Sequence, residues 1–456
     1  MKKNLIWLIV LLVLHTLVML FTQFTAWPEM LIYPYLLKQG FAFYGDIVQP
    51  YLPVLPYGLY LGFSWLGFSA SSLQIISILL VLVTDVILYL VVINFFPYFS
   101  VNLILFIYIF LQIFFEGNGI WFDHAAVPFI LIAFVFWNFF LKSKAHKDLI
   151  ICGLMLGIAL TIKQTSFWYA LPITGYLLFK KYPRSCLFFW SCFFTPLFLL
   201  FIIFGPGRLW YWGIYYPLVM MSRAWGYVLY PKLKQLAMVA MVLFPLIIDA
   251  INKFNKKNYT QCWLFIWLFF SFGFLIPRFA YFHLQPALPF LAIGLVEANK
   301  LIDKNKLLKI LSMAYWIFLC FIIGRYLIRQ YNRPVRFFEP EVFKTTSFLK
   351  QILPVYQPVF FYNDMGNYMV TGEFLPVKPW AYNFPWYMEL PGLQEKIIEA
   401  LEKNKVIRVV FVPFKNEGKY VPGSYVPKLI DQYIKANYKI DKKINNDLFL
   451  LKRFDH

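Results

Sequence analysis

Long apolar runs alternate with short polar or basic segments over the first 330 residues. About eleven of these runs approach the length of a helix that crosses a bilayer. They fall at roughly 4–23, 72–95, 100–115, 124–141, 148–162, 165–179, 186–204, 235–251, 262–277, 280–297 and 309–328. The pattern predicts an all-α polytopic membrane domain over residues 1–330. The first run has no small-residue cleavage site after it, which indicates an uncleaved helix.

The segment after the first run is polar enough to lie outside the bilayer. It reads WPEMLIYPYLLKQGFAFYGDIVQPYLPVLPYG over residues 27–58. Pro28 suits a first helical position, apolar residues recur at helical spacing, and Gly40 ends the run. We expect an amphipathic helix on the membrane surface with Glu29 at its N-terminus. A second surface segment, LPYGLYLGFSWLG, is too short and too rich in glycine to span.

The pattern changes from about residue 331 onward to that of a soluble domain. VYQPVFFY and VIRVVFVPF read as strands, LQEKIIEALEK and VPKLIDQYIKA as helices, and NDLFLLKR as a closing strand. The order predicts a small α/β domain over residues 331–456. It contains neither a glycine-rich phosphate loop nor a nucleophile elbow.

Composition supports this membrane assignment. The chain is 61% hydrophobic and only 14% charged, which is too little polar surface to cover a soluble protein of 456 residues. Its net charge of +20 would suggest nucleic acid in a soluble protein. The basic residues instead gather in short segments between apolar runs, where they orient helices, so a nucleic-acid partner is excluded.

The distribution of basic residues predicts the orientation. If the N-terminus is cytoplasmic, the inner segments carry fifteen Lys and Arg residues and the outer segments carry seven. The inner clusters lie mainly at 142–147, 180–184, 253–257 and 300–309. The positive-inside rule then places segments 27–58, 116–123 and 205–234 and the C-terminal domain outside the cytoplasm.

Ionisable side chains recur at the predicted outer ends of the helices. Carboxylates occur in segment 27–58 and in EGNGIWFDHA, and cations occur near KQT and in IPRFAYFHLQPALP. A carboxylate can take the proton of an acceptor hydroxyl, while Arg or Lys neutralises a departing phosphate. These groups therefore suit a transferase whose donor is a lipid-linked phosphate. The ionisable residues concerned are Glu29, Asp46, Asp123, His124, Lys163, Arg278, Tyr281 and His283, and the polar Gln285 lies in the same stretch as the last three.

Each of these side chains also has a structural explanation. Carboxylates stabilise helix N-termini, as Glu29 and Asp123 would, or turns, as Asp46 would. Buried histidines are often hydrogen-bond donors, and Lys or Arg at helix ends reach toward lipid headgroups. Asp85 lies deep within an apolar run, far from the outer face. We favour an interhelical hydrogen bond for it over a functional role.

Four stretches carry a family resemblance. They are WPEMLIYPYLLKQGFAFYGDIVQPYLPVLPYGLYLGFSWLGFS, GNGIWFDHAAVPFILIAFVFW, GLMLGIALTIKQTSFWYALP and IPRFAYFHLQPALPFLAIGL. In order and spacing, residues 1–330 resemble the GT-C glycosyltransferases of the protein O-mannosyltransferase and lipid A aminoarabinose transferase type. The chain departs from that family in its first outer loop. The usual acidic pair is replaced by Pro28 and Glu29, so only Glu29 can fill its role.

The resemblance implies an inverting sugar transfer from a polyprenyl-phosphate donor to a lipid, protein or glycan acceptor at the outer face of the plasma membrane. Glu29 would be the catalytic base or a carboxylate that positions the acceptor. Asp123 would be the second acid, with Asp46 supporting the loop or a divalent metal. Metal dependence stays open, because basic side chains can also neutralise phosphate. The pool of phosphate-binding cations is Lys163, Arg278, Arg208 and Arg223.

A transporter or flippase of a lipid-linked or amphipathic substrate is the alternative. It would explain the helices and Asp85, but not the acidic residues of the first outer segment. Internal repeats of the kind that mark many transporters are not visible in the sequence.

Overall fold

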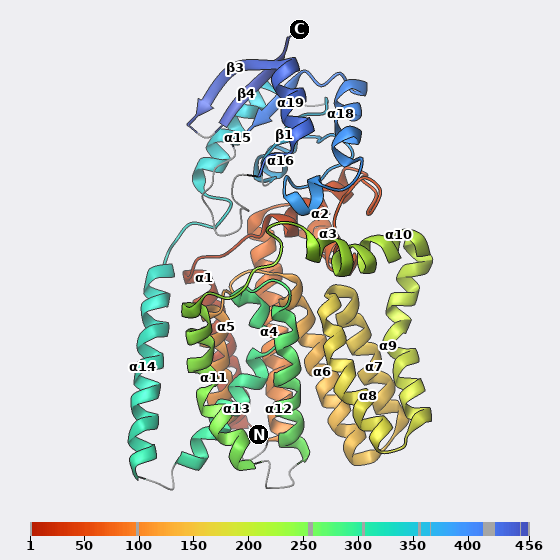
Figure 1. Cartoon of the computed structure of the whole chain (residues 1–456). Helices are drawn as coiled ribbons and strands as arrows, with labels where there is room; N and C mark the ends of the chain where they lie inside the picture. The colour runs from red at the N-terminus through yellow and green to blue at the C-terminus, as the bar shows by residue number, and fades with distance from the viewer. Residues whose placement is uncertain are drawn as a thin grey trace. The chain divides into compact units, whose positions relative to one another are not determined.

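The computed structural model describes residues 2–96, 100–253, 259–302, 306–353, 357–364, 366–413, 425–446 and 448–454. Two compact units can be distinguished, and their elements are labelled in Figure 1. The first unit comprises Met1–Phe24, Ile75–Ile203 and Tyr230–Arg333. The second comprises Thr25–Gln74, Phe204–Leu229 and Pro334–His456. These units do not coincide with the predicted division into residues 1–330 and 331–456.

The elements of the first unit are helical. They are α1 (Lys2–Phe21), α4 (Ala70–Phe95, from its sixth residue), α5 (Val101–Phe114), α6 (Phe122–Ser143), α7 (His146–Ile162), η1 (Gln164–Tyr169), α8 (Ala170–Phe179), α9 (Pro183–Phe204), α11 (Leu233–Lys253), α12 (Tyr259–Ser271), η4 (Phe272–Leu275), η5 (Tyr281–Leu284), α13 (Leu288–Ile302) and α14 (Lys306–Gln330). Every predicted apolar run therefore contains a helix. The run predicted at 280–297 starts differently, because a short 3-10 turn precedes α13.

The length of these helices decides which of them could cross a membrane. Four helices of the described residues are long and apolar enough to cross a bilayer, namely α4, α6, α9 and α14 (from Lys309). Shorter apolar helices lie at Leu5–Phe21, Val101–Phe114, Leu233–Leu246, Cys262–Leu275 and Leu288–Ala298. The predicted number of about eleven spans stays a prediction. Some of the basic residues that predict the orientation, at 254–258 and 303–305, lie outside the described residues.

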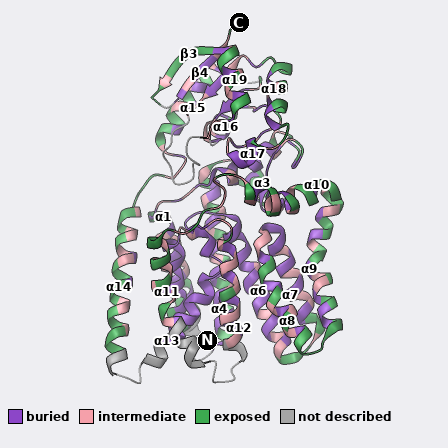
Figure 2. Cartoon of the chain, viewed as in Figure 1, coloured by how far each residue is buried: buried purple, intermediate pink, exposed green. Residues whose placement is uncertain are grey.

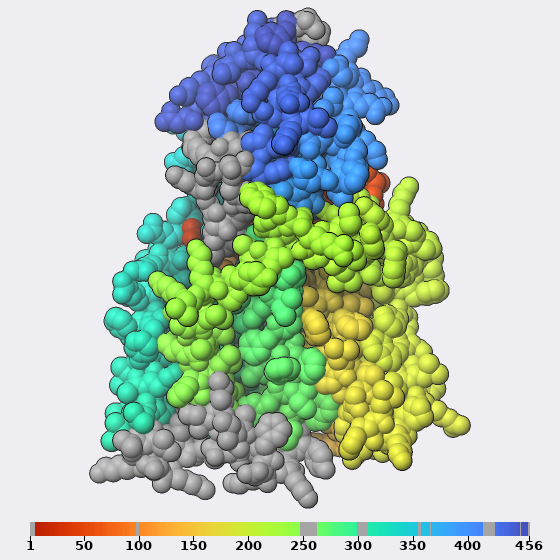
Figure 3. Space-filling view, viewed as in Figure 1, coloured from red at the N-terminus to blue at the C-terminus, as the bar shows by residue number. Residues whose placement is uncertain are grey.

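Apolar side chains on α9 and α14 face outward from the first unit. Phe198 and Ile202 on α9, and Phe321 and Ile328 on α14, are each more than half exposed. Figure 2 shows both helices largely exposed or intermediate, whereas α6 is mostly buried, and α14 forms surface in Figure 3. Exposed apolar surface of this extent is unfavourable in water and favourable in lipid.

Close packing of α7 against α9 depends on two glycines. A methyl group on Gly153 would approach the carbonyl oxygen of Phe189 to 2.8 Å, and one on Gly157 would overlap the carbonyl oxygen of Phe193. Small residues one turn apart allow helix backbones to approach in this way. The glycine-rich pattern of GLMLG therefore sets the distance between these helices.

We expect Gly157→Ala to destabilise the protein by about 1–3 kcal/mol, because the added methyl group has no room beside α9. The loss should appear as a lower melting temperature of the protein in detergent. Gly175→Ala on α8 is the matched control, because no atom lies within 4 Å of the added methyl group. Equal melting temperatures for the two variants would refute the packing role of Gly157.

The second unit contains further helices and a four-stranded sheet. Its helices are α2 (Pro28–Lys38), α3 (Val54–Leu66), α10 (Pro206–Trp210), η2 (Tyr211–Met220), η3 (Met221–Arg223), α15 (Pro340–Ile352), α16 (Asn367–Gly372), α17 (Pro385–Met388), α18 (Leu393–Lys403) and α19 (Lys428–Asn437). The strands are β1 (Phe360–Tyr362), β2 (Arg408–Phe411), β3 (Tyr438–Asn445) and β4 (Leu448–Arg453), in the order β1-β2-β4-β3.

The sheet matches the predicted α/β pattern with one addition. Strands β1 and β2 pair in parallel, and β2–β4 and β3–β4 pair antiparallel. The pattern did not predict β3, because its side chains from Lys439 to Lys443 are exposed and mostly charged. Lysines on an edge strand protect it from pairing with another chain. Residues 355, 356, 414 and 447 of the predicted strands lie outside the described residues.

Helix α2 begins and ends where the sequence predicts, but its surroundings differ from the prediction. Pro28 occupies its first turn, and Gly40 follows its end with a positive φ of 75°. All residues from Met30 to Leu36 are buried within the protein. The expected amphipathic surface helix is therefore a core element, because residues distant in sequence cover the face predicted to be polar.

The covering residues come from the C-terminal part of the chain. The hydroxyl group of Tyr35 donates to the carbonyl oxygen of Phe374 at 2.9 Å. The backbone amide of Trp380 donates to the carbonyl oxygen of Asp46 at 2.7 Å, and that of Val48 donates to the carbonyl oxygen of Trp380 at 2.9 Å. Segment 27–58 and the C-terminal part thus share one core.

Candidate active site

A fully buried carboxylate forms the centre of the polar cluster in the first unit. Asp123 lies in the first turn of α6 with no exposed surface. Its Oδ2 atom accepts a hydrogen bond from Nδ1 of His283 at 2.9 Å and pairs with Nζ of Lys163 at 3.4 Å. A buried carboxylate is costly unless it is paired, and these two partners provide the pairing.

Asp123 does not cap its helix. The residue at the N-cap of α6 is Trp121, which makes no side-chain capping bond. Oδ1 of Asp123 is buried and has no hydrogen-bond partner among the described residues. The carboxylate thus contacts Lys163 and His283 through Oδ2, and Oδ1 can accept a hydrogen bond from a further donor.

Two backbone arrangements bring these partners together. Lys163 is the residue at which α7 ends, just before the 3-10 turn η1 begins. His283 belongs to the 3-10 turn η5, two residues before Gln285. The side-chain amide of Gln285 donates to the carbonyl oxygens of Gln112 at 3.1 Å and Phe115 at 3.0 Å. Gln285 therefore anchors η5 to the end of α5 and has a positioning role.

The loop before α6 is held by buried amides. Nδ2 of Asn118 donates to the carbonyl oxygens of Met19 at 2.8 Å and Thr22 at 3.0 Å. Nε2 of Gln112 donates to the carbonyl oxygen of Gly117 at 2.7 Å. Neither amide was among the predicted site residues. Polar residues inside apolar runs, such as Gln112 in ILFIYIFLQIFF, were the signal that could have identified them.

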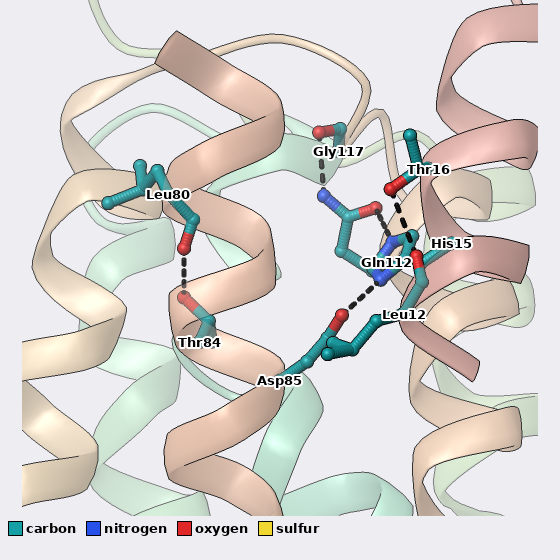
Figure 4. A network of polar contacts seen from close by, with 8 residues as sticks. All are labelled: Leu12, His15, Thr16, Leu80, Thr84, Asp85, Gln112 and Gly117. Atoms are coloured by element: carbon teal, nitrogen blue, oxygen red, sulfur yellow. Dashed lines mark hydrogen bonds and ion pairs between the residues drawn. The ribbon is translucent and has the colours of Figure 1, made fainter. Parts of the chain in front are cut away.

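Gln112 also takes part in polar contacts that join α1, α4 and α5 (Figure 4). Nδ1 of His15 on α1 bonds Oδ2 of Asp85 on α4 at 2.8 Å, and Nε2 of His15 lies 3.2 Å from Oε1 of Gln112 on α5. All three side chains are buried. The predicted interhelical hydrogen bond of Asp85 is confirmed, and it joins three helices.

The other predicted residues of the first unit lie on the same segments. His124 follows Asp123 and is buried, and neither ring nitrogen makes a hydrogen bond of ordinary geometry within the described residues. Arg278 precedes η5, and its charge acts on His283. The ring of Tyr281 packs against that of Phe115, with centroids 5.7 Å apart.

The remaining predicted residues belong to the second unit. Glu29 lies in the first turn of α2 and is partly exposed. Arg208 on α10 and Arg223 on η3 have exposed side chains. The predicted carboxylates and cations are thus divided between the two units, with Asp123, Lys163 and Arg278 in the first.

The side chain of Asp46 makes hydrogen bonds that stabilise a turn. Its Oδ2 atom accepts hydrogen bonds from the amide of Ala42 and from Nζ of Lys378, both at 2.9 Å. Partial burial raises the pKa of Asp46, but these two donors outweigh that effect and lower it overall. Lys378 also donates to the carbonyl oxygen of Gly40 at 3.0 Å. Asp46 therefore stabilises the turn after α2, as one reading of the sequence proposed.

The residues do not offer an evident metal site. Within the described ranges, no group of three or more His, Cys, Asp and Glu side chains could hold a metal ion. The carboxylate of Asp123 already faces the ammonium group of Lys163, which would repel a divalent cation.

Comparison with known proteins shows which family and which solved structures the chain resembles. The profile of the family described as dolichyl-phosphate-mannose-protein mannosyltransferase matches residues 48–212. A crystal structure of ArnT from Cupriavidus metallidurans bound to undecaprenyl phosphate matches with a TM-score of 0.61, covering 99% of this chain and 98% of that chain at 10% identity. The apo structure of the same protein matches with a TM-score of 0.61, at 9% identity and the same coverage.

The chain has the fold of ArnT. The resemblance to GT-C glycosyltransferases that the sequence suggested is therefore confirmed. The matched range of the mannosyltransferase profile includes Asp123 and Lys163, but neither Glu29 nor His283. A comparison with curated proteins finds no match.

We expect Asp46→Asn to lower the melting temperature at neutral pH. A folded-state pKa below that of the unfolded chain means that the carboxylate stabilises the fold above its ordinary pKa near 4. That contribution is lost as the pH falls through the folded-state pKa, so the difference from wild type should shrink as the pH falls below the ordinary pKa of the carboxyl group.

Glu373→Gln is the matched control for this measurement. It removes a carboxylate from a more exposed pair with Lys38, at 3.8 Å, where little stabilisation is expected. A melting difference for Asp46→Asn that stays constant from neutral to acidic pH would contradict the assignment.

Proposed function

We propose that the protein is a membrane glycosyltransferase that transfers a sugar from a polyprenyl phosphate to an acceptor hydroxyl at the outer face of the plasma membrane. The observation that carries the proposal is the buried Asp123 carboxylate with Lys163 and His283, in a chain with the ArnT fold. One of the matched ArnT structures contains undecaprenyl phosphate, a lipid of the proposed donor class. The acceptor class, whether lipid, protein or glycan, is open.

The chemistry needs a base for the acceptor. In the proposed reaction, the acceptor oxygen attacks the anomeric carbon from the side opposite the phosphate, which inverts its configuration. The bond from that carbon to the phosphate oxygen breaks, and its electron pair leaves with the phosphate. The acceptor proton moves to the carboxylate of Glu29, a residue that is partly exposed although its Oε2 atom is buried.

The departing phosphate needs positive charge. Lys163 is suited to this role because its ammonium group is mostly buried, where electrostatic interactions are strong. Asp123 holds that ammonium group in place through Oδ2, and His283 contacts the same oxygen atom. Arg278 adds a second cation near His283. Asp123 is then a positioning carboxylate for the donor site.

A transporter of a lipid-linked substrate is the rival function. It shares the need for a cationic phosphate site, and the described helices are compatible with it. It gives no reason for a carboxylate at the N-terminus of α2, whose loss a transporter should tolerate. Turnover of the donor therefore separates the two functions.

We expect Glu29→Gln and Asp123→Asn to lower the transfer rate by about two to four decades, since each removes a carboxylate while keeping the side-chain shape. The assay uses purified protein in lipid nanodiscs and a panel of radiolabelled polyprenyl-phosphate sugars. Folding of each variant is checked by its melting temperature. If the wild type consumes no donor, or both variants match it, the proposed function fails.

Replacing Lys163 tests the phosphate contact separately. We expect Lys163→Met to reduce kcat by about two to three decades, because one cation that stabilises the leaving phosphate is lost. Lys163→Arg keeps the charge and should recover part of the rate. An unchanged kcat in Lys163→Met would remove Lys163 from the donor site.

A further inference from the structure

Three tyrosines of the second unit surround the first turns of α2. Tyr33 lies one helical turn after Glu29, on the same face of the helix. The ring of Tyr33 packs edge to face against that of Tyr382, with centroids 6.3 Å apart. Tyr382 in turn lies 6.4 Å from Tyr387. All three side chains are almost completely buried.

The C-terminal segment 376–388 supplies two of these tyrosines, and several contacts fix its position. Trp380 exchanges backbone hydrogen bonds with the chain around Asp46, and its ring lies 4.6 Å from that of Tyr382. The hydroxyl group of Tyr216 donates to the carbonyl oxygen of Trp386, just before Tyr387. The three phenol rings are thus held by a rigid frame.

The phenol groups of these three tyrosines are neutral hydrogen-bond donors, and the charge of Glu29 affects their pKa values. Burial is the main cause that raises the pKa of each of Tyr33, Tyr382 and Tyr387, and the charge of Glu29 raises all three further. A neutral phenol can donate a hydrogen bond to a carboxylate. The hydroxyl groups of Tyr33 and Tyr382 are buried without a partner of ordinary geometry among the described residues, although Tyr387 acts on the pKa of Tyr33 as a hydrogen-bonding group. A buried hydroxyl in this state calls for an explanation, such as a bound water or a functional role.

We propose that Tyr33, Tyr382 and Tyr387 position the carboxylate of Glu29 by hydrogen bonding, so that segment 376–388 is part of the catalytic apparatus. The inference rests on the proposed function, because it assigns these tyrosines to the carboxylate that takes the acceptor proton. It gives the C-terminal part a role in catalysis itself, beyond binding an acceptor. The tyrosines are positioning residues and act through Glu29.

Tyr35 on the same helix is a buried tyrosine with a structural role, and it can be compared with Tyr33. It is as deeply buried as Tyr33, but its hydroxyl group donates a hydrogen bond to the carbonyl oxygen of Phe374. Glu29 is not among the charges that act on it, whereas Glu373 is. Tyr35→Phe is therefore the matched control, which should lower the melting temperature and leave kcat unchanged.

The test is a double-mutant cycle on the full-length protein in nanodiscs, with the polyprenyl-phosphate sugar that the wild type consumes. We expect Tyr382→Phe and Tyr387→Phe each to lower kcat about tenfold or more with little change in KM, since a hydrogen bond to a charged group is strong. In the Glu29→Gln background, the same tyrosine substitutions should cause little further loss, because they act through the missing carboxylate. The melting temperature of every variant is measured alongside.

The outcomes separate this inference from the proposed function. If Glu29→Gln lowers transfer strongly but measurably, and Tyr382→Phe lowers kcat by the same factor in both backgrounds or in neither, the positioning role is overturned and the transferase stands. If Glu29→Gln retains full activity, or no donor is consumed, both ideas fail together, because no catalytic carboxylate remains to be positioned.

Discussion

The buried carboxylate of Asp123 is the constraint on which the first unit depends. Without exposure to water, it is tolerated only because Lys163 and His283 meet it. Those partners come from the end of α7 and from η5, so three distant segments must be fixed to one point. The amides of Gln285 and Asn118 provide that fixation through hydrogen bonds to backbone carbonyl groups. An electrostatic requirement at one atom thus explains a large part of the polar packing.

The second unit must cover an apolar helix, and it also does so through contacts between residues that are distant in the sequence. Helix α2 carries apolar side chains around its whole circumference, and it cannot stay exposed at an aqueous surface. The C-terminal segment around Trp380 covers it by backbone pairing, and Tyr35 joins it by a side-chain bond. This joint core accounts for the division of the chain into units that mix early and late residues. A helix held in this way gives Glu29 a fixed support, which its proposed catalytic role requires.

Local pattern in the sequence predicts most of the elements. The apolar runs became helices, and Pro28 and Gly40 marked the limits of α2, because length, periodicity and turn residues are encoded locally. The interhelical role of Asp85 also followed, since a buried carboxylate needs a partner. Long-range pairing could not be deduced. Neither Lys378 beside Asp46 nor Tyr382 beside Tyr33 has a signal in its neighbouring residues.

In the proposed reaction, Lys163 binds the phosphate of the donor and the carboxylate of Glu29 takes the proton of the acceptor. A cryo-EM structure of the protein in nanodiscs, with a polyprenyl-phosphate sugar analogue that cannot be cleaved, tests the first of these roles directly. The phosphate should lie within contact distance of the ammonium group of Lys163. A phosphate bound away from Lys163 would contradict this role.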